Sequence, residues 1–318
     1  MMSSSPCSLS PSTLPLLLLP LVLLALTFFV MHPFDFQLQS VFPSTSCPPS
    51  TNDNYVAPTA RMTAAATPTP DFRLLMGILT HPDNYERRHL IRLAYSLQGD
   101  FSANLDIRFV FCNLTKEEQT VLVALEIIRY DDIIILDCEE NMDKGKTYTY
   151  FSTLPKILDA TYDYVMKTDD DTYFRLENLV GSLKNKPKTD MYSGLVMPCD
   201  TENFFPFPPY MSGMGYILSW DLVEWIATSE LTRKETEGPE DMWTGRWMNM
   251  ANRAKNRFDN APAMYDFKGP FPTNCFRHDF IPDTIAVHKL KDNSRWASTL
   301  KYFNVTKELK PSKLYHIP

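Results

Sequence analysis

From residue 72 onward, apolar runs of strand length alternate with stretches of helical periodicity. The first run covers 72–79 (FRLLMGIL), and a helix-like pattern follows over about 85–97. A second run spans 105–111 (LDIRFVF), a further helix is predicted to about residue 130, and 133–136 (IIIL) predicts a third buried strand. Repeated strand-then-helix units are typical of a parallel, doubly wound sheet with helices on both faces. The pattern therefore predicts an α/β domain.

Local signals refine this prediction. The segment 115–118 (TKEE) has the form of a capping box that opens the second helix. Another helix is expected over 145–160, interrupted or kinked near Pro155. A short strand over 162–167 then runs directly into three aspartates at 169–171. The aspartates are thus predicted to lie at the carboxyl end of a buried strand.

The first 70 residues show neither the apolar pattern of a strand nor that of a helix of the domain. Their only charged side chains are Asp35, Asp53 and Arg61, and 14–31 is an uncharged stretch of 18 residues. As a helix this stretch would be about 27 Å long, enough to span a thin bilayer. We expect an uncleaved anchor rather than a signal peptide, because a positive n-region is missing and no small-x-small cleavage site follows Met31.

The segment 32–70 is rich in Pro, Ser, Thr and Ala, which is typical of a flexible stem. Composition changes at Asp71, which indicates a domain boundary. We therefore expect a short tail at 1–13, the anchor at 14–31, the stem at 32–70 and a working domain at 71–318.

Charge and cysteine content narrow the class of function. A net charge of −7 and a pI near 5.4 argue against nucleic-acid binding, so handling of phosphate groups would require a metal ion. Six cysteines lack zinc-ligand spacing, and the four within 71–318 are either paired in an oxidising lumen or buried thiols. Sequons at Asn113 and Asn304 are weak signals of a lumenal, glycosylated domain.

Three consecutive carboxylates would repel one another unless they shared a cation. Oxygen ligands favour Mg²⁺ or Mn²⁺, ions that also bridge to diphosphate oxygens. Ligands of open α/β sheets gather at the carboxyl ends of strands, where 169–171 is predicted to lie. The residues alone leave two interpretations, a metal site and a solvated acidic turn.

Two further segments carry candidate chemistry. Pro239, at a first helical position, places Glu240 and Asp241 in the opening turn of a helix. There they are either capping groups favoured by the helix dipole or a general base at the edge of a pocket. Gly213 and Gly215 interrupt a strand-like aromatic segment, which indicates either a β-bulge or the close approach of a ligand.

Taken in order, these motifs resemble the inverting β-1,3-galactosyltransferase and N-acetylglucosaminyltransferase family of the Golgi, which has a GT-A fold with a mixed, mainly parallel sheet. The resemblance covers roughly 72–290. It rests on RHLIR at 88–92 followed by Tyr95, KTDDD at 167–171, PYMSGMGY at 209–216 and EDMWTG at 240–245. Tyr95 and Met242 stand where Trp and Val are usual, and 140–147 replaces a central Asn-Leu-Thr segment, so the departures concern donor and acceptor identity.

The resemblance implies roles for individual residues. Asp241 would be the catalytic base, and Asp171 would coordinate the metal ion directly, with His288 completing the metal shell at the end of a last strand. Other residues would contact the substrates: Asp169, Asp170, Arg88, Arg92 and Lys167 at the donor nucleotide, and Tyr210, Ser212, Gly213, Gly215 and Glu240 at the acceptor pocket.

The implied enzyme is a Mn²⁺-dependent (or Mg²⁺-dependent) transferase that moves a hexose from a UDP-sugar to a glycan hydroxyl on a glycoprotein or glycolipid. Galactose is the first expectation for the donor and N-acetylglucosamine the second. The resemblance also implies a single-pass type II protein of the Golgi membrane with a lumenal domain. Rival functions are a metal-dependent phosphohydrolase and a non-catalytic, anchored sugar-binding protein.

Overall fold

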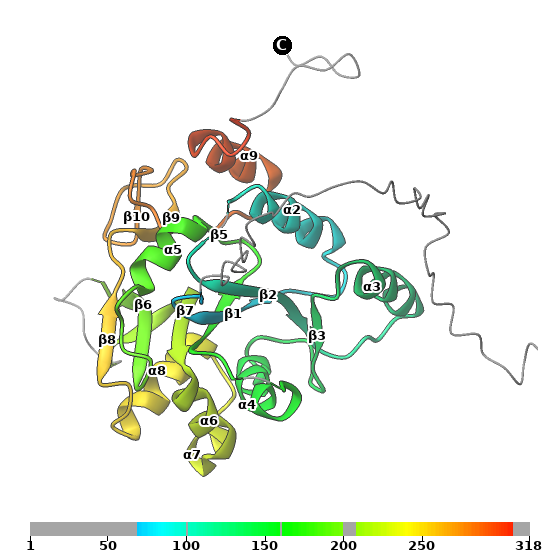
Figure 1. Ribbon diagram of the computed structural model, residues 1–318, viewed down its shortest axis with the longest axis vertical. Helices are drawn as coiled ribbons and strands as arrows, with labels where there is room; N and C mark the ends of the chain where they lie inside the picture. The colour runs from blue at the N-terminus through cyan, green and yellow to red at the C-terminus, as the bar shows by residue number, and fades with distance from the viewer. Residues whose placement is uncertain (1–68, 100, 160, 200–207, 308–318) are drawn as a thin grey trace, which may run out of the picture. The chain divides into compact units, whose positions relative to one another are not determined.

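The computed structural model describes residues 69–99, 101–159, 161–199 and 208–307, which all belong to one compact unit of the chain (Figure 1). The expected tail, the anchor at 14–31 and almost all of the stem lie outside the described residues. Of the helices within these ranges, none combines the length and the apolar character that a membrane crossing requires.

Seven strands among the described residues form the main sheet, in the order β3-β2-β1-β4-β7-β6-β8. The first four of these lie parallel, whereas β7 runs antiparallel to both β4 and β6. The prediction of a mixed, mainly parallel sheet is confirmed. The bounds are β1 Arg73–Leu79, β2 Asn104–Phe111, β3 Ile133–Ile135, β4 Tyr164–Asp169, β6 Met191–Met197, β7 Tyr210–Ser219 and β8 Asn256–Asp259.

A second, smaller sheet has the order β10-β9-β11-β5. Its strand β5 (Tyr173–Phe174) directly follows the three aspartates and pairs antiparallel with β11 (Ala286–His288). On its other side, β11 pairs parallel with β9 (Met264–Phe267), which pairs with β10 (Arg277–His278). This sheet brings a segment more than a hundred residues away in sequence beside the end of β4.

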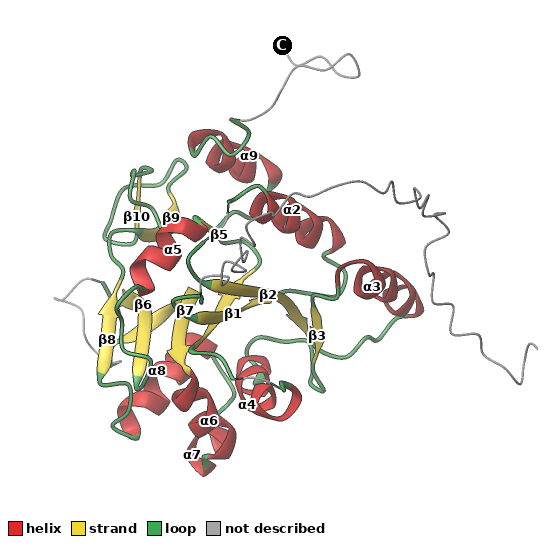
Figure 2. Ribbon diagram, viewed as in Figure 1, coloured by secondary structure: helices red, strands yellow, loops and turns green. Residues whose placement is uncertain are grey.

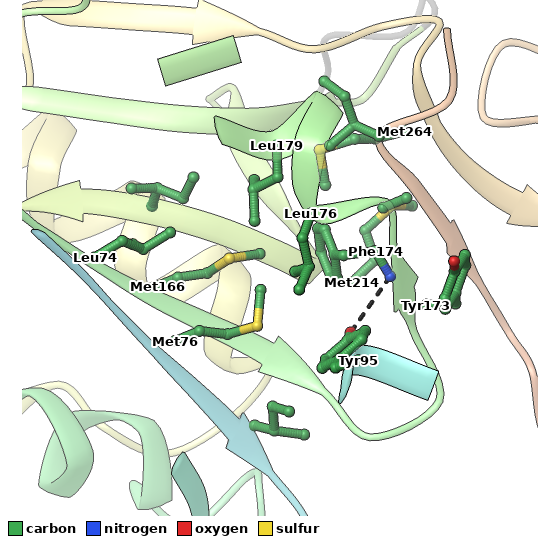
Figure 3. Packing of buried hydrophobic residues seen from close by; sticks show 14 of the residues in the cluster. Leu74, Met76, Tyr95, Met166, Tyr173, Phe174, Leu176, Leu179, Met214 and Met264 are labelled. Atoms are coloured by element: carbon green, nitrogen blue, oxygen red, sulfur yellow. Dashed lines mark hydrogen bonds between the residues drawn. The ribbon is translucent and has the colours of Figure 1, made fainter. Parts of the chain in front are cut away.

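Helices cover both faces of the main sheet (Figure 2). Alternate residues of β1 point to opposite faces, so Leu74 and Met76 enter one core while Leu75 and Leu79 enter the other. The first core packs against α2, α5 and α9, and the second against α4, α6 and α8. Figure 3 shows part of the first core, with Tyr95 of α2 and Leu176 and Leu179 of α5 near the strand residues. The helices are α2 Tyr85–Ser96, α3 Glu117–Tyr130, α4 Lys146–Ile157, α5 Leu176–Leu183, α6 Trp220–Thr228, α7 Glu230–Lys234, α8 Glu240–Met250 and α9 Asn293–Tyr302.

Three local predictions need correction. Helix α3 is capped by Gln119, whose Oε1 accepts from the backbone N–H groups of Thr115 and Lys116 at 2.9 and 3.1 Å, rather than by the predicted box at 115–118. Strand β3 is not buried, because it is an edge strand, and Ile135 is 42% exposed. Helix α4 is not interrupted at Pro155, which lies in its last turn and removes only the one backbone hydrogen bond that its missing N–H would donate.

The four cysteines of the working domain are paired as Cys112–Cys138 and Cys199–Cys275. The first disulfide joins the end of β2 to the segment after β3. The second joins the segment after β6 to the segment before β10. The sequence left open whether these cysteines are paired or are buried thiols, and the structure shows them paired in two disulfides.

Candidate active site

Asp169, Asp171 and His288 lie together where β4 ends beside β11. Their potential ligand atoms are all within 4.8 Å of one another. His288 Nε2 is 3.2 Å from Asp171 Oδ1 and 3.5 Å from Asp169 Oδ2. The side chains of Asp171 and His288 are almost completely buried.

Buried polar atoms at this point have no hydrogen-bond partner among the described residues. These atoms are the two carboxylate oxygens of Asp171 and Nε2 of His288. His288 Nε2 faces Asp171 Oδ1 without the alignment of a hydrogen bond. Lys291 Nζ lies 2.5 Å from Asp171 Oδ2, and its positive charge is the ion-pair partner of that carboxylate. Buried groups normally have partners, and two carboxylates with one imidazole are a suitable donor set for Mn²⁺ or Mg²⁺. The residues present therefore fit a divalent cation.

The charges of the group decide which of these residues could bind an ion without first losing a proton. Burial opposes ionisation of Asp171, yet His288 and Lys291 lower its pKa to about 2. Burial likewise opposes ionisation of Asp169, but Lys167 and His288 hold its pKa well below the usual range. Burial lowers the pKa of His288, whereas Asp169, Asp171 and Asp266 together raise it to about 10. Both carboxylates are thus ionised, as metal ligands must be, whereas His288 is protonated without a metal ion and would release its Nε2 proton when an ion binds.

Asp266, on β9, is a candidate functional residue that the sequence reasoning missed. Its Oδ1 is 2.8 Å from His288 Nδ1, and the carboxylate is buried. This contact fixes the imidazole so that Nε2 points toward Asp169 and Asp171, the arrangement that orients a metal-binding histidine. The only signal in the sequence was an aspartate inside the short alternating segment MYDF, which is too common to single out.

Asp170 has other hydrogen-bond partners than its two neighbours Asp169 and Asp171. Its Oδ2 accepts hydrogen bonds from Thr80 Oγ1 at 2.6 Å and Asn84 Nδ2 at 2.9 Å. Both donors lie in the loop between β1 and α2. The carboxylate of Asp170 therefore holds that loop against the end of β4, and its predicted role at the donor nucleotide stays a prediction.

Lys167 and Glu240 form a buried ion pair that crosses β7. Lys167 Nζ donates to Asp169 Oδ1 at 2.8 Å, to Gly213 O at 2.9 Å and to Glu240 Oε1. Tyr216 OH donates to Glu240 Oε2 at 2.9 Å. Burial raises the pKa of Glu240 to about 7 despite the lowering effect of Lys167. The pair links the strand that carries the aspartates to the start of α8.

Asp241 lies in the first turn of α8, next to that pair. Its Oδ2 accepts from Gly213 N at 2.9 Å and its Oδ1 from Met242 N at 2.8 Å. Helix α8 begins at Glu240, with Pro239 at the position before it. The two backbone donors fix the orientation of the carboxylate and leave its remaining lone pairs available to accept a proton from a ligand.

The two glycines of β7 lie in a β-bulge, which is one of the two alternatives that the sequence left open, and protein side chains approach them closely. The pairing of β6 with β7 shifts register between Gly194 and Val196, so β7 bulges in this stretch. A Cβ on Gly213 would lie 2.9 Å from Glu240 Oε1, and one on Gly215 would lie 2.6 Å from Phe174 Cζ. Gly213 therefore allows the carboxylates of α8 to approach the strand, whereas Gly215 allows the core to close.

We expect Gly215→Ala to destabilise the domain by about 1–3 kcal/mol, because the added methyl group overlaps Phe174 and Met166 in a packed core. The measurement is the free energy of unfolding from urea titration. Gly181→Ala is the matched control, since Gly181 lies in α5 with open space around it. That control should be neutral or more stable by about 0.5–1 kcal/mol. Equal stability of the Gly215 variant and wild type would contradict the packing described.

A cavity of about 350 Å³ lies between the aspartate cluster and α8. It brings together six of the predicted site residues with Asp266 and several others. The predicted residues that line it are Asp169, Ser212, Gly213, Glu240, Asp241 and His288. Asp171 and Lys167 lie just behind its wall and contact His288 and Glu240. Tyr210, half-buried, contacts Gly245 of α8 instead of lining the cavity.

Arg88 and Arg92 do not line this cavity. Arg88 is fully buried, and it donates to both oxygens of Glu126 and to the carbonyls of His81 and Pro82. Arg92 pairs with Glu126 and, through two hydrogen bonds, with Asp132. These guanidinium groups join α2 to α3 and to the residues at its end, and their predicted role at the donor nucleotide stays a prediction.

The two sequon asparagines, Asn113 and Asn304, are exposed. Asn113 Nδ2 donates to Asp137 Oδ1 at 3.0 Å. Their glycosylation stays a prediction.

Comparison with known proteins gives consistent matches. The family model described as Galactosyltransferase matches residues 86–256, just over half of the chain. Beta-1,3-galactosyltransferase pvg3 of Schizosaccharomyces pombe is 26% identical, over 69% of this chain and 71% of that protein. Hydroxyproline O-galactosyltransferase GALT2 of Arabidopsis thaliana is 24% identical, over 66% of this chain and 33% of that protein. Human UDP-GalNAc:beta-1,3-N-acetylgalactosaminyltransferase 1 is 30% identical, over 47% of this chain and 52% of that protein. The matches thus span from a third to about seven tenths of these relatives.

Proposed function

This chain belongs to the galactosyltransferase family and is a glycosyltransferase, and from that premise we propose that it transfers galactose from UDP-galactose to a glycan hydroxyl, forming a β-1,3 linkage with inversion. The observation that carries the proposal is the arrangement around one cavity: a candidate metal group on one side and the carboxylate of Asp241 on the other. Family membership accounts for the transfer chemistry, and the cavity supplies residues for each part of it.

The donor side of the proposal rests on Asp169, Asp171 and His288, which would hold Mn²⁺ or Mg²⁺. A bound divalent ion supplies positive charge to the departing diphosphate. The chain itself contributes the orientation of these ligands: Asp266 fixes the ring of His288, and Lys167 fixes Asp169. Lys289 also lines the cavity and adds a positive charge near the position proposed for the diphosphate.

The acceptor side rests on Asp241. Its carboxylate is held by the N–H groups of Gly213 and Met242 and lines the cavity, so it is placed to accept the proton of an attacking hydroxyl. One base is sufficient for a single displacement, which inverts the anomeric centre. Glu240 is engaged by Lys167 and Tyr216 and in this proposal positions α8 rather than accepting the proton.

We further propose a Golgi protein with a type II anchor at 14–31 and a lumenal domain. Two disulfides within the domain support an oxidising compartment.

The experiment incubates the full-length chain with UDP-galactose, UDP-N-acetylglucosamine or UDP-N-acetylgalactosamine, a panel of glycan acceptors, and Mn²⁺ or EDTA. We expect transfer from UDP-galactose that requires both acceptor and metal ion, and NMR of the product should show a β-1,3 linkage. UDP-N-acetylglucosamine is included because it is the second expectation for the donor. UDP-N-acetylgalactosamine is included because the human relative is named for that donor. Consumption of the UDP-sugar without acceptor, with UMP and sugar phosphate as products, would indicate a phosphohydrolase, and glycan binding without nucleotide release would indicate a sugar-binding protein.

A further inference from the structure

Helix α3 exposes an unusually apolar surface. Val121, Leu122, Leu125 and Ile128 are 57, 42, 59 and 83% exposed, respectively. Of the whole helix, only Gln119 and Val123 are buried. Single exposed apolar residues are ordinary, but a contiguous group of this size on one element indicates a surface that is covered by something else.

The surface continues onto α2. An apolar trough of about 670 Å³ runs between the two helices, which lie next to each other on the right of Figure 1. Its walls include Tyr85 and His89 of α2 and Leu122, Leu125 and Tyr130 of α3. The trough shares no lining residue with the cavity that holds Asp241. An occupant of the trough would leave the candidate active site open.

The order of residues along α3 indicates what that occupant is. Glu118, Leu122, Leu125 and Arg129 are spaced by four, three and four residues, so they form one stripe along the helix. The stripe has an acid at its N-terminal end, two leucines in the middle and a base at its C-terminal end. Laid antiparallel against a copy of itself, each Leu122 meets the other Leu125, and each Glu118 meets the other Arg129.

We propose that α3 is the interface of a homodimer, with two copies of the helix packed antiparallel across a two-fold axis. Such an interface is isologous, because the same patch is used by both copies. Val121 and Ile128 flank the stripe and would be covered together with the trough. A membrane surface is a less suitable occupant, since Glu117 and Glu118 lie on the same helix and the chain carries a net charge of −7.

The test measures the dimer dissociation constant of the full-length chain in detergent micelles by sedimentation velocity. Cys7 and Cys47 are replaced by serine in every variant, so that they cannot form intermolecular disulfides. Arg129→Glu places like charges at both ends of the stripe and should raise the dissociation constant about tenfold or more. Combining it with Glu118→Arg restores opposite charges, and the double variant should recover dimers of near wild-type affinity. Recovery by charge exchange cannot arise from simple destabilisation.

Leu125→Glu should also abolish the dimer, while the matched control Ile157→Glu, at an apolar residue of α4 that is 49% exposed, should not. Thermal unfolding of each variant verifies that the domain is folded. A wild-type chain that remains monomeric at about 100 μM, where interfaces of ordinary affinity are occupied, would overturn the proposal. So would a double variant as weak as Arg129→Glu.

Discussion

Replacing Asp241 by asparagine is expected to lower kcat about a thousandfold, the size of effect that a positioned general base contributes. The amide nearly preserves the shape of the side chain, and its oxygen can still accept from Gly213 N. What it loses is the ability to take a proton from the acceptor hydroxyl. Because the candidate metal group lies on another element, binding of UDP and Mn²⁺ should stay within about threefold of wild type.

Steady-state kinetics with saturating UDP-galactose and calorimetric titration of UDP with Mn²⁺ measure the two effects separately. Asp143→Asn is the matched control, because Asp143 is another carboxylate that lines the same cavity and has no proposed part in the chemistry. Its kcat should remain within about threefold of wild type. Near-normal turnover of the Asp241 variant would remove Asp241 as the base and leave Glu240, with its raised pKa, as the next candidate.

Replacing Asp171 by asparagine is expected to abolish binding of Mn²⁺ and, with it, transfer. The Oδ1 atom of this buried carboxylate lacks a hydrogen-bond partner within the described part of the chain and faces His288 Nε2, and its Oδ2 atom is paired with the ammonium group of Lys291. An amide offers only one weaker oxygen ligand and no charge. Electron paramagnetic resonance of added Mn²⁺ measures the bound ion directly and needs no activity.

Asp266→Asn should weaken Mn²⁺ binding by about 10–100-fold without abolishing it, since the amide orients His288 less strongly than the carboxylate does. Asp279→Asn is the control, because Asp279 follows β10 at the surface and pairs with Lys268. If Asp171→Asn leaves Mn²⁺ binding unchanged, the ion is held at another site.

The parts of the fold that follow from local pattern were predictable. The apolar runs of β1 and β2 and the helical periodicity of α2 each appear in the structure within a few residues of the predicted ranges. Strand neighbours were not predictable in the same way. β7 lies between β4 and β6 and runs antiparallel to both, and this pairing depends on long-range contacts that leave no mark in a short window of sequence.

In the candidate site, too, residues in recognisable motifs were predictable, whereas contacts between distant residues were not. The family resemblance singled out Asp171, Asp241 and His288, and the structure brings all three to one cavity or its wall. The pattern that singled out Arg88 and Arg92 could not show that Glu126 and Asp132 lie within reach on the next helix and its end. Asp266 was missed for the converse reason, since its partner is 22 residues away in sequence.

Because β11 comes late in the chain, the candidate metal group is completed late in biosynthesis. The main sheet is complete in sequence at Asp259, where β8 ends, but Asp266 and His288 come later in the chain. A growing chain can therefore assemble its large sheet on the ribosome while the cation group is still lacking its imidazole. A metal ion bound there would stabilise the finished domain but could not guide its early folding, so metal depletion should yield folded, inactive protein rather than failed synthesis.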